Sequence, residues 1–281
     1  MSIKFVIDSA SDILPEEAKR LGAVHLPLTI RFGDTEYFDG VNLSHKEFYE
    51  KLIESNTLPT TSQINPAMFE ETFEKLVNEG HTVIAITLSS KLSGTYQSAI
   101  IAAQEYKDKV FVVDSENVCV GERVLILRGI ELLKEGLSAK DIVDKLNEEK
   151  KNIKVLGLLD TLEYLKKGGR ISAAAAFAGG ILSIKPVITV KDGVVELVGK
   201  ARGSKQGNNL LREMIAKTGI DFNKPLSLGY SGLSDELLQK YIKDSESLWQ
   251  GQADELRIST VGATIGTHVG PGAIAIAFFV S

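Results

Sequence analysis

Short apolar runs alternate with longer amphipathic segments over the first half of the chain. The pattern predicts strands at 4–7, 23–31, 82–88 and 110–113, and helices at 15–22, 44–54, 66–78, 96–106 and 139–150. Strands separated by helices of this length are typical of a mostly parallel sheet with helices on both faces.

The pattern changes after about residue 150. Asp192-Gly193 between two apolar runs is a strong hairpin signal. The other predicted elements are strands at 155–158, 226–231, 256–261 and 274–280 and helices at 161–167, 172–182, 207–217 and 235–249. A chain of 281 residues suits two domains, although one large α/β domain is the alternative. We expect an N-terminal α/β domain (1–155), a C-terminal α/β domain with a mixed sheet (156–281), and a ligand cleft between them.

Composition narrows the function classes. The net charge of -5 argues against nucleic acid as a partner. Cys119, the single cysteine, excludes an internal disulfide and is expected to fill the core. Lys4 and Asp8 interrupt the first apolar run, and no run reaches the roughly 18 residues of a membrane span. We therefore expect a cytoplasmic protein without membrane insertion.

A hydroxyl-rich and glycine-containing stretch, residues 88–99, follows the apolar run 83–87 and leads into a predicted helix. The unpaired N–H groups of a helix start attract an anion. Ser93 and Thr95 add donors, and Gly94 allows close approach to the main chain. Since neither GxxxxGK[ST] nor GxGxxG occurs, the expected anion is a carboxylate or a phosphate held without those motifs. The alternative is ordinary helix capping.

Thr60-Thr61-Ser62 precedes the helix predicted from Pro66 in the same way, so the two loops could hold two oxygens of one carboxylate. Asp8-Ser9 and Asp114-Ser115 follow two predicted strands, where open α/β sheets bind ligands. Turn capping by the aspartates is the competing interpretation.

His268 lies in a glycine-rich stretch, 262–273, that we expect to be a loop. It is a candidate for contacting an anionic group, as a proton donor or as a cation, unless its role is structural. The four histidines, at 25, 45, 81 and 268, lack metal-site spacing.

Arg170, between two predicted helices, could pair with a carboxylate or phosphate. The small residues 173–180 leave room for a neighbouring helix or a slender apolar ligand. Lys200, Arg202 and Lys205 form a basic loop that is either solvated surface or a docking site.

Ser93 and His268 could also supply a nucleophile and a base, which would make the chain an acyl hydrolase or transferase. No GxSxG elbow occurs, and no third residue can be assigned as the orienting acid. This interpretation is the alternative to binding.

The chain resembles the DegV family from end to end. The segments that carry the resemblance are 6–12, 60–63, 92–99, 159–171, 185–186 and 268–273. The resemblance implies two α/β domains with a long-chain fatty acid between them. In several bacteria such proteins act as the FakB subunit of fatty-acid kinase, which presents the carboxylate to an ATP-dependent partner that makes acyl phosphate for phospholipid synthesis. It implies no catalysis by this chain and neither cofactor nor metal, and we expect a monomer.

By motif, the resemblance assigns the carboxylate to Thr61 and Ser93, with Ser62, Gly94 and His268 around it. Arg170 and Arg202 lie on motifs near the head group or a docking face. One departure is that residues 63–66 read Gln-Ile-Asn-Pro where the family commonly has Gln-Pro directly, which slightly weakens the assignment of Ser62.

Overall fold

The structure is a computed structural model that describes residues 2–171, 184–249, 251 and 255–281. The helix predicted at 172–182, with its small residues, lies outside the described residues. Among the described helices, none is both long and apolar enough to cross a membrane.

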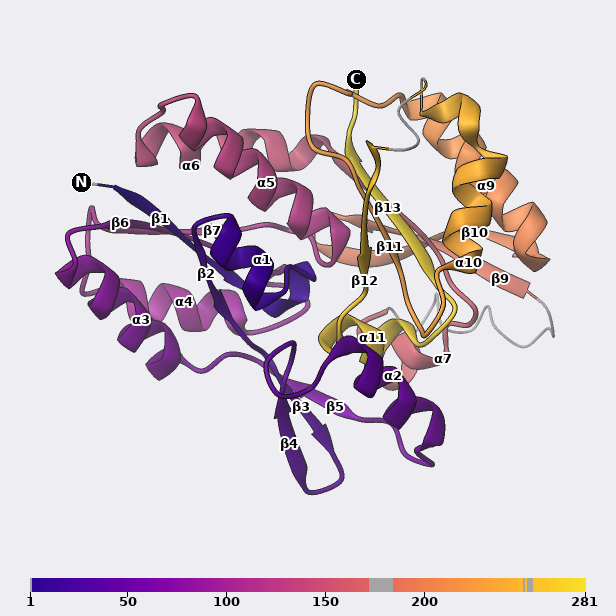
Figure 1. Cartoon of the computed structure of the whole chain (residues 1–281), viewed down its shortest axis with the longest axis horizontal. Coiled ribbons are helices and arrows are strands. Elements are labelled where there is room, and N and C mark those ends of the chain that lie inside the picture. Colours follow the sequence, from indigo (N-terminus) through magenta and orange to yellow (C-terminus); the bar gives the residue numbers. More distant parts are fainter. Residues whose placement is uncertain (1, 172–183, 250, 252–254) are drawn as a thin grey trace.

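The first sheet contains four parallel strands in the order β2-β1-β6-β7. In Figure 1, helices α3 and α4 lie on one side of it and α5 and α6 on the other. The predicted parallel sheet with helices on both faces is therefore confirmed. The bounds are β1 Ile3–Asp8, β2 Ala23–Leu26, β6 Thr82–Thr87, β7 Val110–Asp114, α1 Pro15–Arg20, α3 Pro66–Asn78, α4 Thr95–Ala103, α5 Val120–Lys134 and α6 Ala139–Glu149.

The second sheet has six strands in the order β10-β9-β8-β13-β11-β12, and of its neighbouring pairs only β11 and β12 run parallel. It is the predicted mixed sheet. The predicted hairpin is present, with Asp192 and Gly193 both at positive φ (48° and 78°), as a tight two-residue turn requires. The bounds are β8 Ile153–Leu158, β9 Ile184–Lys191, β10 Val194–Arg202, β11 Ser227–Tyr230, β12 Arg257–Thr260, β13 Ile274–Phe279, α7 Glu163–Lys167, α9 Gly203–Thr218 and α10 Glu236–Asp244.

Helix α5 joins the two sheets. It packs against α6 on the first sheet and against β8, β11 and β13 of the second, and one apolar cluster runs continuously from Phe5 to Val155 and Ala277. The sequence pattern did not reveal α5, because most of its residues are buried and no polar face marks its period. Strand β8 pairs only with the second sheet. We retain the division into 1–155 and 156–281 as a proposal.

A third, small antiparallel sheet was not predicted. Its order is β4-β3-β5, with β3 Thr29–Phe32, β4 Thr35–Phe38 and β5 Thr60–Ser62. The single strand predicted at 23–31 is therefore wrong. Pro27, which has no N–H for a ladder, lies between β2 and β3, and the chain passes there from one sheet to the other.

The loop predicted at 262–273 is also wrong in part, because Ala263–Val269 form helix α11. Its N-terminus is capped by side chains from the other end of the chain, which no local pattern could reveal. Helix α2, His45–Glu54, begins at a Ser44–Glu47 capping box and packs against α11. The basic segment 200–205 is likewise not a loop, since it spans the end of β10 and the start of α9.

Candidate functional site

An apolar pocket lies between the two large sheets. It encloses about 940 Å³ outside the protein atoms, counting the part open to solvent at its mouth. Its apolar wall includes Val155, Gly157, Ile188, Val190, Ala275, Leu28, Leu88, Leu92, Val118, Cys119, Ile265 and Val269.

Polar residues from four separate segments meet on the wall of this pocket. The structure brings together Thr61, Ser62, Ser93, Arg170 and His268, all of which line it. Most of the site residues that the sequence analysis predicted therefore lie together.

Two of the proposed residues do not line the pocket. Gly94 follows Ser93 and lies against the Gln63 amide, which would collide with any Cβ at this position. Arg202 is exposed at the end of β10 and is not part of the pocket wall.

Thr61 and His268 form a hydrogen bond of 3.1 Å between Oγ1 and Nε2, although 207 residues separate them. Thr61 lies on β5, which pairs with β3, whereas His268 lies in the last turn of α11. Burial, together with the positive charge of Arg170, lowers the pKa of His268 to about 4. The imidazole is therefore neutral at neutral pH, which favours the proposed role as a hydrogen-bond donor over that as a cation.

The two hydroxyl clusters predicted separately are adjacent. Ile64 N donates to Thr95 Oγ1 at 3.3 Å, and Gln63 Nε2 donates to Ser98 Oγ at 3.0 Å, so the segment after β5 is tied to α4. Ser93 Oγ lies 3.0 Å from Thr95 Oγ1 and accepts from Thr95 N at 3.3 Å. The N-terminus of α4, with its partial positive charge, is thus close to both clusters.

The arrangement does not favour a serine nucleophile. Ser93 Oγ is bonded to Thr95, and His268 Nε2 to Thr61. The other ring nitrogen, His268 Nδ1, is buried without a hydrogen-bond partner among the described residues, so no acid orients the imidazole. A nucleophile–base–acid chain, which the hydrolase alternative requires, is absent from this part of the chain.

Arg170 spans the gap between the Ser93 loop and the end of α7. Its Nε donates to Leu92 O at 3.3 Å, and one terminal nitrogen donates to Gly168 O at 2.6 Å. Arg170 lines both the pocket and two surface depressions beside it. It is placed to supply positive charge where the pocket meets solvent.

Asp8 and Asp114 cap turns and do not line the pocket. Asp8 accepts from Ala10 N at 2.9 Å and from Leu88 N at 2.8 Å, and burial raises its pKa to about 7. Asp114 Oδ1 accepts from Ser90 N and Glu116 N. Both aspartates therefore cap turns, as the competing interpretation of the sequence predicted. The described residues contain no group of side chains suited to a metal ion.

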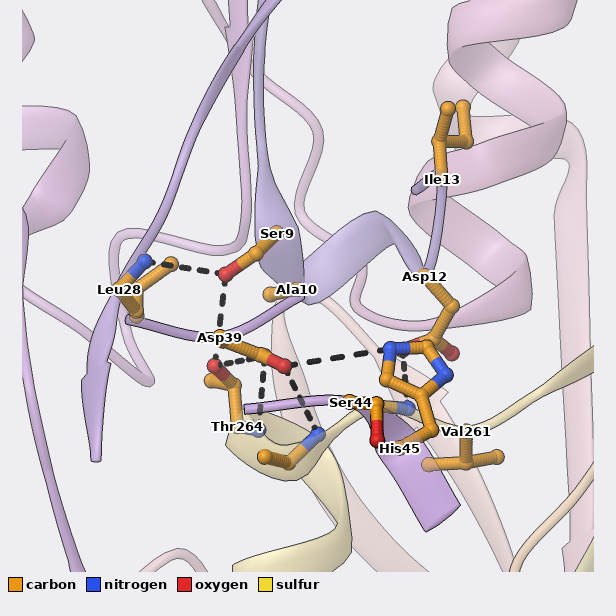
Figure 2. A network of polar contacts seen from close by, with 12 residues as sticks. Ser9, Ala10, Asp12, Ile13, Leu28, Asp39, Ser44, His45, Val261 and Thr264 are labelled. Carbon is orange, nitrogen blue, oxygen red and sulfur yellow. Dashed lines mark hydrogen bonds and ion pairs between the residues drawn. The ribbon is translucent and has the colours of Figure 1, made fainter. Parts of the chain in front are cut away.

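Sequence reasoning missed Asp39, which is completely buried and binds the start of α11 (Figure 2). Phe38-Asp39-Gly40 reads as an ordinary turn, and no local signal distinguishes it. Cys119 was predicted to fill the core; it is buried as expected, but it also forms part of the pocket wall.

Comparison with known proteins gives matches along the whole chain. The family model described as "Uncharacterised protein, DegV family" matches residues 2–281. A DegV domain-containing protein of Caldanaerobacter subterraneus is 37% identical over 279 residues, covering 98% of each chain.

Two solved structures are similar over their full length, covering 100% of both chains. One is a DegV family protein of Thermus thermophilus, named for its fatty-acid binding, with 34% identity and a TM-score of 0.88. The other is DegV of Bacillus subtilis, described as a fatty acid binding protein, with 32% identity and a TM-score of 0.81.

We predict that His268 titrates near pH 4 in the ligand-free protein, which NMR of the ring nitrogens can measure. Because this pKa lies below the unfolded value of about 6.5, the contribution of His268 to stability is present above about pH 6.5 and is lost as pH falls toward 4. Arg170→Gln should raise the pKa, since it removes a nearby positive charge. A titration near 6.5 in the folded protein would contradict the burial argument.

Proposed function

The chain belongs to the DegV family, and from this premise we propose that it binds a long-chain fatty acid, with the acyl tail between the sheets and the carboxylate at Thr61 and Ser93. One observation carries the proposal: an apolar pocket whose wall contains a single gathering of hydroxyl, imidazole and guanidinium groups. The related Thermus and Bacillus proteins are named as fatty-acid-binding.

The tail supplies most of the affinity in this proposal. Burying roughly fourteen methylenes at about 0.8 kcal/mol each gives an upper bound on the order of 11 kcal/mol. Each hydrogen bond to the head group adds about 1.5–3 kcal/mol. The head group therefore chiefly determines which way the ligand lies.

A carboxylate that is partly withdrawn from water in a pocket needs several donors or a cation. The Thr61 and Ser93 hydroxyls, the N-terminus of α4 and the Arg170 guanidinium provide them. Ser62, Gly94 and His268 complete the surroundings, with His268 donating a hydrogen bond as a neutral ring.

We further propose that the protein is a carrier and not an enzyme. In this role it presents the carboxylate to an ATP-dependent fatty-acid kinase in the cytoplasm, which forms the acyl phosphate. The absence of a nucleophile–base pair between Ser93 and His268 in the described site supports a carrier over a hydrolase. Arg202, exposed and outside the pocket, is a candidate for docking the kinase.

Native mass spectrometry of the purified protein and extraction of its lipid test the proposal directly. We expect one long-chain fatty acid per chain, retained or taken up on incubation with palmitate. A lipid-free chain that takes up no fatty acid would refute it. Incubation with an activated acyl ester should give no turnover that depends on Ser93.

Ser93→Ala should weaken palmitate binding by about 1.5–3 kcal/mol, or roughly tenfold to more than a hundredfold, because the carboxylate loses a hydroxyl donor. Titration calorimetry or displacement of a fluorescent fatty acid measures the change. Ser90→Ala is the matched control, since Ser90 is exposed in the same loop and does not line the pocket. If both variants change palmitate affinity equally, the carboxylate does not bind at Ser93.

Arg202→Glu should slow acyl-phosphate formation by an added fatty-acid kinase with ATP while palmitate affinity stays within about twofold. The reason is that reversing an exposed charge changes the association between proteins, whereas Arg202 does not line the pocket that holds the ligand. Arg20→Glu, at an exposed basic position on α1, serves as the control. If both variants support the same rate, Arg202 has no part in docking.

A further inference from the structure

We propose that Asp39 is a positioning residue of the head-group site: by clamping α11 to the small sheet, it holds His268 against Thr61. It need not touch the ligand. Only the palmitate-binding test of this inference depends on the proposed function.

Asp39 grips the first residues of α11. Its side chain is fully buried, and Oδ1 accepts from Ala263 N at 3.0 Å while Oδ2 accepts from Thr264 N at 2.9 Å and from Thr264 Oγ1 at 2.5 Å. Figure 2 shows the three contacts converging on one carboxyl group. The first N–H groups of a helix have no partner within it, so this carboxylate satisfies donors that would otherwise be buried unpaired.

The same residue is anchored to the element that carries Thr61. Asp39 directly follows β4, which pairs with β3, and β3 pairs with β5 so that Ile30 faces Thr61. Its own N–H donates to Leu28 O at 3.0 Å, just before β3. The path from Asp39 to Thr61 therefore runs through hydrogen-bonded sheet.

On the other side of Asp39, one turn of α11 leads from Thr264 to His268. The Thr61–His268 hydrogen bond closes a ring that runs from Asp39 through the small sheet to Thr61 and back along α11. Ser9 adds a weaker link to the same helix start, since its Oγ accepts from Leu28 N at 3.0 Å and lies 3.5 Å from Thr264 Oγ1. A displacement of the N-terminus of α11 relative to Asp39 therefore also moves the imidazole of His268.

Helix α2 limits the ways in which α11 could relax. A Cβ at Gly266 would lie 2.5 Å from Phe48 Cε1 and 2.7 Å from Tyr49 Oη, so the two helices are in close contact. Tyr49 Oη also donates to Val261 O at 2.9 Å. Helix α2 holds the side of α11 in place. Loss of the Asp39 hydrogen bonds should therefore displace mainly the ends of α11, and His268 lies at one of these ends.

Neighbouring titratable groups do not replace the clamp. His45 Nε2 lies 3.9 Å from Asp39 Oδ1, but burial lowers its pKa, so the ring is neutral at neutral pH. Asp12 Oδ1 accepts from Gly262 N at 2.7 Å, one residue before α11, and reaches none of the donors that Asp39 binds.

A double-mutant cycle with palmitate as the probe tests the proposal. Asp39→Asn keeps the volume and removes one acceptor, and we expect on the order of tenfold weaker binding. In a His268→Ala background, Asp39→Asn should weaken palmitate binding by less than about twofold, because the imidazole that Asp39 positions is gone.

Asp8→Asn is the matched control. Asp8 is an equally buried carboxylate, but it binds Leu88 N at the start of the Ser93 loop and not α11. Its effect should persist in the His268→Ala background. Equal losses from Asp39→Asn with and without His268, or no loss at all, would overturn the proposal, since a merely destabilising substitution would give that pattern.

A second readout needs no ligand. Asp39→Asn should shift the ring ¹⁵N signals of His268 toward those of Thr61→Val, in which the hydrogen bond is lost. If Asp39→Asn does not fold, Thr264→Val should give the shift and Thr264→Ser, which keeps the hydroxyl, should not. Unchanged signals would refute the positioning role, whereas a wild-type protein that takes up no palmitate would refute the proposed function and leave this test intact.

Discussion

Three buried carboxylates hold the segments around the pocket in place. Asp8 binds the main chain of Leu88, Asp12 that of Gly262, and Asp39 that of Ala263 and Thr264. Each satisfies N–H groups of a segment far away in sequence, and burial raises the pKa of Asp8 and Asp12 to about 7. That rise is the cost of withdrawing carboxylates from water, which the fold tolerates because unpaired buried amides would cost as much.

Side chains of the second sheet point alternately to its two faces, so one face packs against helices while the other lines the pocket. On one face of β8, Leu156 and Leu158 pack with α9 and α10 in a dense cluster. On the other face, Gly157 is paired with Ala275 across the strands, and both line the pocket. Small residues there leave space that large ones would fill. A hollow centre can therefore coexist with a well-packed protein, because the packing is concentrated on the opposite face.

The polar end of the pocket is suited to holding an anion and poorly suited to attacking an acyl group. Hydroxyls and a helix N-terminus offer donors, and Arg170 offers charge, while the neutral His268 is already bonded to Thr61. A general base would need a free ring nitrogen near Ser93 and an acid behind it. The geometry thus agrees with the proposed binding of a carboxylate and not with chemistry on an acyl group.

The sequence by itself determined the class of fold and most of the residues now found together at the site. Local rules were enough for the α3 start at Asn65-Pro66, the Asp192-Gly193 hairpin and the parallel strands, because capping, turn conformation and hydrophobic period act within a few residues. The Thr61, Ser93 and His268 candidates followed from residue type and motif.

Only the tertiary structure decided how those candidates meet. The helical state of 263–269 and the role of Asp39 depend on hydrogen bonds between segments more than two hundred residues apart. The break at Pro27 becomes a change of sheet because β3 pairs with β4 and β5 and not with β1. A glycine-rich stretch such as 262–273 favours a loop on its own. It becomes a helix here because a distant carboxylate satisfies its first N–H groups, and such a contact leaves no trace in the local sequence.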